Sequence, residues 1–136
     1  RGTTRPFEFI GAPWMDSKKL TSRLNQLGLA GTHFRVQAFT PSFSKYESRL
    51  CQGVHIHVTD RNSFKPITVA LHFLAEVLKL HPNEFKFDEQ SFDYLAGNSW
   101  IREALLNNQQ IGRIVEQWKT PLQDFKNTRR KYLLYP

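Results

Sequence analysis

The first eight residues concentrate side chains that bind anions and hydroxyl groups. Segment 1–8 holds two arginines, two threonines and one carboxylate, Glu8. Arginine forms forked hydrogen bonds with carboxylates, and threonine hydroxyls pair with other hydroxyls or with oxyanions. A carboxylate in such a segment is also a candidate for the acid–base chemistry that splits glycosidic bonds, which usually needs two carboxyl groups. In the structural alternative, Arg5 and Glu8 pair with each other or cap the neighbouring loop.

Two histidines share one face of a predicted strand. His55 and His57 are two residues apart, which on a strand separates them by roughly 7 Å. Metal hydrolases use this spacing, but a catalytic zinc needs a third protein ligand. The other histidines, His33, His72 and His81, stand at no spacing that supplies one. We therefore predict neither a metal site nor a cofactor.

The single cysteine, Cys51, lies just before the same strand. One cysteine excludes an internal disulfide and every multi-cysteine zinc site. Nucleophilic catalysis would need a positioned base, for which His55 is the nearest candidate in sequence. A small buried thiol is the better supported interpretation.

The charge balance favours an anionic partner. Lysine and arginine number 19 against 12 acidic residues, which gives a net charge of +7 and a pI of about 9.8. Basic and aromatic residues also interleave, a pattern that stacks bases in some nucleic-acid-binding proteins. These residues are Arg35, Phe39, Phe43, Lys45, Tyr46 and Arg49. Because no known nucleic-acid-binding signature accompanies them, such a domain is only a third hypothesis.

Hydrophobic patterns predict the elements that position these residues. Segments 34–39 and 54–59 alternate apolar and polar residues, as half-buried strands do. Leucines repeat helically over 17–27, after a capping Asp16 or Ser17. The complete prediction comprises strands 7–10, 34–39 and 54–59, a short edge strand 85–87, and helices 17–27, 66–80, 91–95, 99–107 and 110–132. The last helix is expected to break at Pro121, with Thr120 as a new N-cap.

These elements predict an α+β fold, with four or five helices covering one side of a small sheet of two to three main strands. A length of 136 residues fits one domain spanning 1–136. The aromatic content of 13% is too high for a disordered chain. No apolar run approaches the roughly 20 residues that span a bilayer. Because the chain starts with arginine and carries no signal peptide, we expect it to be part of a longer polypeptide.

Five motifs follow one another along the chain. They are Arg-Gly-Thr-Thr-Arg-Pro-Phe-Glu (1–8), Gly-Ala-Pro-Trp (11–14), Phe-Thr-Pro-Ser-Phe-Ser-Lys-Tyr (39–46), Cys-Gln-Gly-Val-His-Ile-His-Val-Thr-Asp (51–60) and Tyr-Leu-Leu-Tyr (132–135). In this order they resemble the C-terminal part of the NamZ-type exo-β-N-acetylmuramidases, a bacterial family once known only as a domain of unknown function. The resemblance covers essentially the whole chain, and the first and fourth motifs are long enough to be specific.

The resemblance implies a glycosidase that removes N-acetylmuramic acid from the non-reducing end of peptidoglycan fragments, in the periplasm or outside the cell. It implies a larger, Rossmann-like domain upstream, which supplies the main catalytic carboxylate and shares a cleft with this chain. The partners implied are muropeptides and that upstream domain, with no nucleic acid and no membrane span. Glu8 is a possible catalytic contributor. The substrate-binding residues implied are Arg1, Thr3, Thr4, Arg5 and Glu8, followed by Tyr46, His55 and His57.

A second hypothesis, from a different class, is a non-catalytic module that binds cell-wall glycan. Binding of muropeptides by the chain alone would favour the module. Binding of oligonucleotides with a steep salt dependence would favour the nucleic-acid hypothesis. A Rossmann-like half preceding Arg1 would favour the enzyme.

Overall fold

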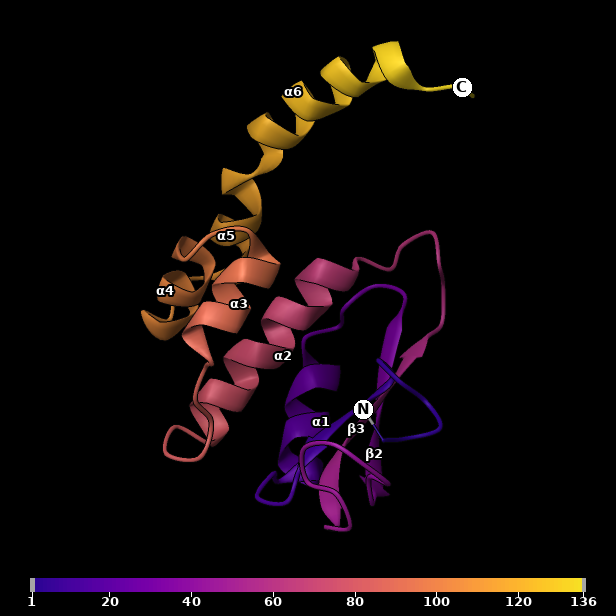
Figure 1. Ribbon diagram of the computed structural model, residues 1–136, viewed down its shortest axis with the longest axis vertical. Helices are drawn as coiled ribbons and strands as arrows, with labels where there is room; N and C mark the ends of the chain where they lie inside the picture. Colours follow the sequence, from indigo (N-terminus) through magenta and orange to yellow (C-terminus); the bar gives the residue numbers. More distant parts are fainter. Residues whose placement is uncertain (1, 136) are drawn as a thin grey trace. The chain divides into compact units, whose positions relative to one another are not determined.

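The computed structural model describes residues 2–135, which divide into two compact units at the boundary between Phe87 and Asp88. The first unit holds a three-stranded sheet with two helices, and the second is helical (Figure 1). The α+β class predicted from the hydrophobic patterns is therefore confirmed. That residues 1–136 act as a single domain stays a prediction.

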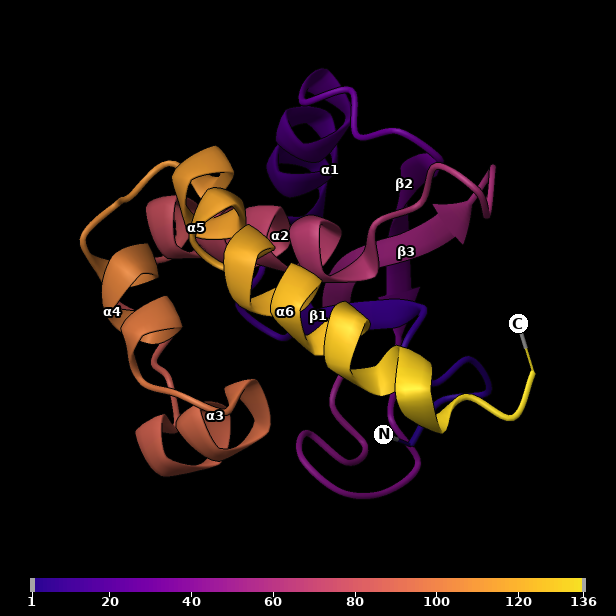
Figure 2. The same ribbon diagram turned by 90° about the horizontal axis from the view of Figure 1, so that it is seen from above.

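The sheet of the first unit is antiparallel, and its last strand lies in the middle. In chain order the elements are β1 (Phe9–Ala12), α1 (Ser17–Gln26), β2 (Thr32–Phe39), β3 (Cys51–Val58) and α2 (Pro66–Leu80). The strand order in space is β1-β3-β2. Both edge strands therefore pair with β3, the strand that carries the two histidines (Figure 2).

Local signals explain the bounds of both helices. The Asp16 carboxylate accepts a hydrogen bond from the Lys19 amide at 3.0 Å and caps α1, as its sequence predicts. Pro66 occupies the first turn of α2, where its missing N–H removes no helical bond. The same helix ends at Leu80 with His81 as its C-cap, as expected from the following proline.

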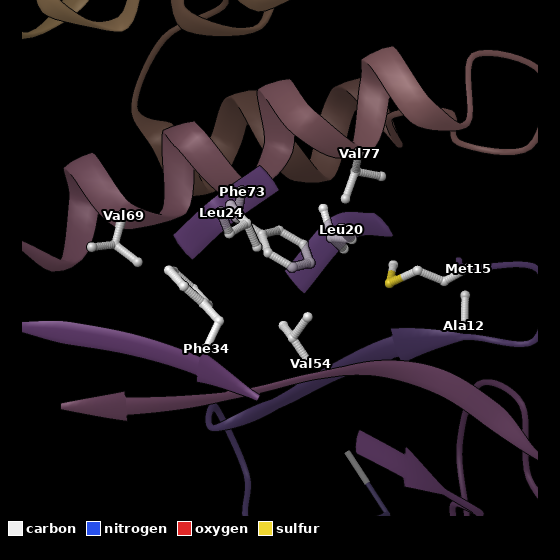
Figure 3. Close-up of a cluster of buried hydrophobic side chains, with 9 residues drawn as sticks. All are labelled: Ala12, Met15, Leu20, Leu24, Phe34, Val54, Val69, Phe73 and Val77. Carbon is white, nitrogen blue, oxygen red and sulfur yellow. The ribbon is translucent and has the colours of Figure 1, made fainter. Parts of the chain in front are cut away.

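The core lies between the two helices and one face of the sheet (Figure 3). Leu20 and Leu24 of α1 are completely buried, which fits their i, i+4 spacing. They meet Phe34 and Val54, which project from β2 and β3. The full cluster is Ala12, Met15, Leu20, Leu24, Phe34, Val54, Val69, Phe73 and Val77.

The predicted apolar face of β2 is only partly buried. Phe34 is buried, but Val36 is 48% exposed and Ala38 is exposed as well. The reason is that β2 is an edge strand, so helices cover one end of it and leave the other in solvent. The alternation of apolar and polar residues predicts which face of the strand points to the core. It does not predict how much of that face the helices cover.

The second unit consists of short helices. They are α3 (Glu89–Ala96), α4 (Trp100–Leu106), α5 (Ile111–Gln117), α6 (Lys119–Arg129) and a final 3-10 turn, η1 (Arg130–Tyr132). The Arg102 guanidinium donates to both carboxylate oxygens of Asp93, at 2.9 and 2.8 Å. This paired contact joins α4 to α3.

Two predicted features of the chain differ in the structure. Residues 85–87 form no strand; their alternation instead reflects Phe85, which packs against the core and meets the Phe87 ring edge-on at 5.1 Å. The last helix breaks at Trp118 rather than at Thr120. Pro121 fits inside the first turn of α6, where proline needs no helical N–H partner.

The strand bounds also shift. The third strand begins at Cys51 rather than Val54, because Gln52 and Gly53 pair with both neighbouring strands. The first strand begins at Phe9 rather than Phe7, since Phe7 has a positive φ of 68° that no strand accommodates.

Candidate functional site

The segment predicted to bind a ligand forms an anchored turn before β1. Arg1 lies outside the described residues. The Gly2 carbonyl accepts hydrogen bonds from the Ser42 amide at 2.8 Å and from its hydroxyl at 3.3 Å. Gly2 has a φ of +72°, and a Cβ there would lie 2.5 Å from the Phe43 carbonyl oxygen. Only glycine therefore allows this contact with the loop between β2 and β3.

Backbone hydrogen bonds fix Glu8 beside the central strand. Its carbonyl accepts from the Ile56 amide at 2.9 Å, and the Arg5 carbonyl accepts from the Phe9 amide at 3.2 Å. Between them Phe7 combines its positive φ with a side chain that is 94% exposed. Backbone strain of this kind is retained where the surrounding structure enforces it, often at functional sites.

The Glu8 carboxylate is held between two cationic or potentially cationic side chains. Arg5 Nη1 lies 3.2 Å from Glu8 Oε2, and His55 Nε2 lies 3.0 Å from the same oxygen. The hydrogen bond with His55, followed by that with Arg5, lowers the pKa of Glu8 below its usual value of 4.5. Arg5 and Glu8 thus pair with each other, as the structural alternative to ligand binding expects. The histidine on β3 is a further partner that the sequence does not pair with Glu8.

The two histidines of β3 lie together, as predicted. Their ring centroids are 3.8 Å apart, with an angle of 44° between the planes. The Phe9 ring meets His55 edge-on at 4.8 Å. Burial, followed by the charges of His55, Arg35 and His33, lowers the pKa of His57. Its Nε2 is shielded from solvent and has no hydrogen-bond partner within residues 2–135.

These side chains belong to the face of the sheet opposite the core. Phe9 and Arg35 stand opposite His55 in the strand register, and His33 stands opposite His57, so alternation places them on one side. The Phe9 and Phe39 rings stack at 5.8 Å. We call this surface the open sheet face. Its residues are Phe9, His33, Arg35, Phe39, His55 and His57.

The remaining predicted residues fall into two groups. Thr3 is half-buried and Thr4 exposed in the anchored turn, near Glu8 in sequence. Tyr46 lies in the loop between β2 and β3 and packs against the core. Lys45 Nζ and Arg49 Cζ lie 5.3 and 5.6 Å from its ring centroid, so the structure gives Tyr46 a cationic setting of its own.

Sequence reasoning missed Phe9, which no pattern linked to the histidines. The signal needed is the register Phe9↔His55, and that register depends on pairing between strands more than forty residues apart. Arg35 was assigned to the polar face of its strand. Its position opposite His55 becomes visible only once β2 is aligned with β3.

The described part of the chain shows neither metal ligation nor a membrane helix. Across residues 2–135, no three histidine, cysteine or acidic side chains are grouped to hold a metal ion. No helix in the same range is long and apolar enough to cross a bilayer. Cys51 is buried, and burial raises the pKa of its thiol. It is therefore a packing residue, as expected.

An ionised Glu8 limits the chemistry of this arrangement. With its pKa lowered, the carboxylate can accept hydrogen bonds from hydroxyl or amide groups, stabilise positive charge or act as a base. A general acid at neutral pH needs a raised pKa instead. The cluster thus supplies one anionic oxygen pair beside a cationic, aromatic face, and Glu8 itself does not fit the role of proton donor in a hydrolysis.

Comparison with known proteins gives three concordant matches. Residues 1–135 match the family model described as exo-β-N-acetylmuramidase NamZ, C-terminal. The chain is 45% identical to the peptidoglycan β-N-acetylmuramidase NamZ of Bacillus subtilis (strain 168), over 99% of this chain and 33% of that protein. A crystal structure of a DUF1343 family protein from Bacteroides fragilis superposes with a TM-score of 0.88 at 29% identity, covering 99% of this chain and 37% of the other. The chain thus spans about a third of the curated relative it matches.

Proposed function

This chain belongs to the NamZ exo-β-N-acetylmuramidase family, and from that premise we propose that it is the C-terminal, ligand-contacting part of a peptidoglycan glycosidase. Its task is to complete the cleft that receives a terminal N-acetylmuramic acid residue. The upstream part of the polypeptide, which the relative's greater length allows for, supplies the remaining catalytic groups. Its work on peptidoglycan puts the enzyme in the periplasm or outside the cell.

The single observation that carries this proposal is the Glu8 carboxylate held between Arg5 and His55. The three groups sit where the anchored turn meets the open sheet face. Muramic acid bears a lactyl carboxylate and its peptides add further acidic groups, which suit an arginine and a basic surface. The exposed ring of Phe7 and the half-buried ring of Phe9 beside them suit the apolar face of a sugar.

The protonation state of Glu8 supports a division of labour. A glycosidase needs a proton donor for the leaving oxygen as well as an ionised group. Since the pKa of Glu8 is lowered, it fits the ionised role or substrate binding. The proton donor then belongs to the upstream part of the enzyme.

Two substitutions test this site in a full-length family protein that carries these 136 residues as its C-terminal part. Arg5→Ala and Glu8→Gln should each reduce kcat/KM on a chromogenic N-acetylmuramide by at least about tenfold, or about 1.4 kcal/mol of transition-state stabilisation. Arg61→Ala and Glu84→Gln are matched controls, since both residues are exposed and lie outside the site. Wild-type kinetics in both site variants would contradict the proposal.

A non-catalytic glycan-binding module is the second candidate. It is favoured by the same ionised Glu8, which can bind but cannot donate a proton. Calorimetric titration of muropeptides into the chain and into its Glu8→Gln variant tests this candidate. Binding that the substitution abolishes, together with no hydrolysis by the full-length protein, would support the module over the enzyme.

A further inference from the structure

The end of the chain exposes a run of apolar side chains on and after helix α6. Leu122 is 45% and Phe125 61% exposed, and their i, i+3 spacing puts them on one helical face. Tyr132 and the three residues after it are exposed as well. We call these residues the C-terminal stripe. They are Leu122, Phe125, Tyr132, Leu133, Leu134 and Tyr135.

Helix α6 has few interactions of its own that stabilise it. It contains 11 residues, none of them buried, and isolated helices shorter than about 12–15 residues are marginal in water. Within the second unit it follows α5 and extends away from α3 and α4 (Figure 1, Figure 2). Its first turn is tied back at Trp118, whose ring lies 6.4 Å from that of Trp100, and at Lys119, which forms an ion pair with Glu116 of α5. A helix of this length with no buried residue needs a surface that covers it if it is to persist in water.

Size decides which kind of partner fits. A helix of 11 residues is about 16 Å long, so one face of it offers far less than the area of about 800 Å² that each partner buries in a typical stable interface. A separate protein or a second copy would also have to offset the loss of translational freedom. A segment of the same polypeptide is already present at an effective concentration near the millimolar range, so a small apolar stripe suffices to hold it.

The length of the relative supplies such a segment. The chain covers only 33% of the Bacillus subtilis protein, so most of a family polypeptide lies outside these residues. We propose that the C-terminal stripe docks on that other part of the same polypeptide, a contact that rests on the multidomain enzyme of the proposed function. Cationic side chains flank the stripe, so the receiving surface is apolar with an acidic rim. The flanking cations are Lys126, Arg129, Arg130 and Lys131.

The test uses two double variants of the full-length protein that differ only in the face they alter. Leu122→Ser with Phe125→Ser removes the helical part of the stripe. Gln123→Ser with Asn127→Ser changes the opposite face, whose two amide side chains bond each other at 3.1 Å. Both doubles introduce two serines, so they weaken intrinsic helix propensity similarly. Hydrogen exchange followed by mass spectrometry reports the protection of amides 119–132.

We expect those amides to exchange at least about tenfold faster in the stripe variant than in the control variant. Equal exchange in the two variants would overturn the proposal. A concentration-dependent dimer of the full-length protein, seen by sedimentation and abolished in the stripe variant, would also overturn it. So would binding to vesicles that contain phosphatidylglycerol, if the stripe variant alone loses that binding. Because no substrate is used, failure of the muramidase assay would leave this result standing.

Discussion

At the scale of single residues, the site depends on how Glu8 shares one oxygen. Arg5 and His55 both contact its Oε2, which leaves Oε1 for a ligand. Their hydrogen bonds lower the pKa of Glu8 below 4.5. The stability that these bonds contribute is therefore complete above pH 4.5 and is lost as the pH falls through the lower, folded-state pKa. At neutral pH the group is a carboxylate, whatever its partner.

His57 makes the stability of the fold depend on pH in a higher pH range than Glu8 does. Its folded-state pKa lies below the ordinary value of 6.5, chiefly because of burial. Between these two pKa values the unfolded chain binds more protons than the folded one, so lowering the pH destabilises the fold. Urea unfolding at pH 7.5 and pH 5.5 should show a loss of stability that is smaller in His57→Gln.

His33→Gln serves as the control for this measurement. His33 is exposed on the same face and is the weakest of the three charges that lower the pKa of His57. Its substitution should leave most of the pH dependence in place. An unchanged dependence in His57→Gln would show that another group is responsible.

At the scale of elements, the central strand β3 carries the site because both neighbours pair with it. Gly53 is where this pairing is tightest, since a Cβ there would lie within 2.0 Å of the Ile10 carbonyl oxygen. An alanine at position 53 would push β1 away from β3 and move Glu8 with it. Glycine at this position is therefore a requirement of strand pairing.

Two glycine substitutions should change stability in opposite directions. Gly53→Ala should destabilise the chain by about 3 kcal/mol, the upper end of what overpacking costs, because the atom it meets is rigid backbone. Gly112→Ala, in α5 where a Cβ meets nothing within 4 Å, should stabilise it by up to about 1 kcal/mol. Chemical denaturation of both variants measures these changes. A Gly53→Ala variant as stable as the wild type would contradict the role given to strand pairing.

The elements that sequence patterns predict well are those with local signals. The helix 66–80 is found as predicted, with its proline start, and α1 ends within one residue of expectation. The strand around Gly53 begins too late in the prediction because an isolated glycine indicates a strand end, whereas here a partner glycine, Gly11, faces it. Such pairing is long-range and leaves no local signal.

The site residues likewise differ in how far local sequence signals predict them. Arg5 and Glu8 are three positions apart, and His55 and His57 share a strand face, so each pair is predictable from spacing. That the two pairs meet at the Glu8 carboxylate depends on the register between β1 and β3. Tyr46 entered the site prediction through the family resemblance, and in the structure it contacts Lys45, Arg49 and the core.

At the scale of the whole molecule, charge and size set what the chain can do alone. Its net charge of +7 favours acidic glycan fragments through long-range attraction, which salt weakens. Yet only Glu8 among its acidic residues lies in the anchored turn. A complete hydrolytic site therefore needs groups that these residues do not provide.

The isolated chain should fold without hydrolysing a chromogenic N-acetylmuramide. Folding is expected because a core of nine residues joins both helices to the sheet. Inactivity is expected because the proposed function assigns the proton donor to another part of the enzyme. Circular dichroism checks the fold, and chromophore release is compared with that of a full-length family protein. Release at a comparable rate by the isolated chain would refute the division of labour.

The anchored turn has a further consequence for how such a domain can diverge. Its two ends are pinned, Gly2 to Ser42 and Glu8 to Ile56, so residues 3–7 bridge a fixed span. An insertion or deletion there would release one of the two ends. Evolution, or an engineer, can therefore exchange the side chains of this bridge freely enough to alter what is bound, but cannot alter its length.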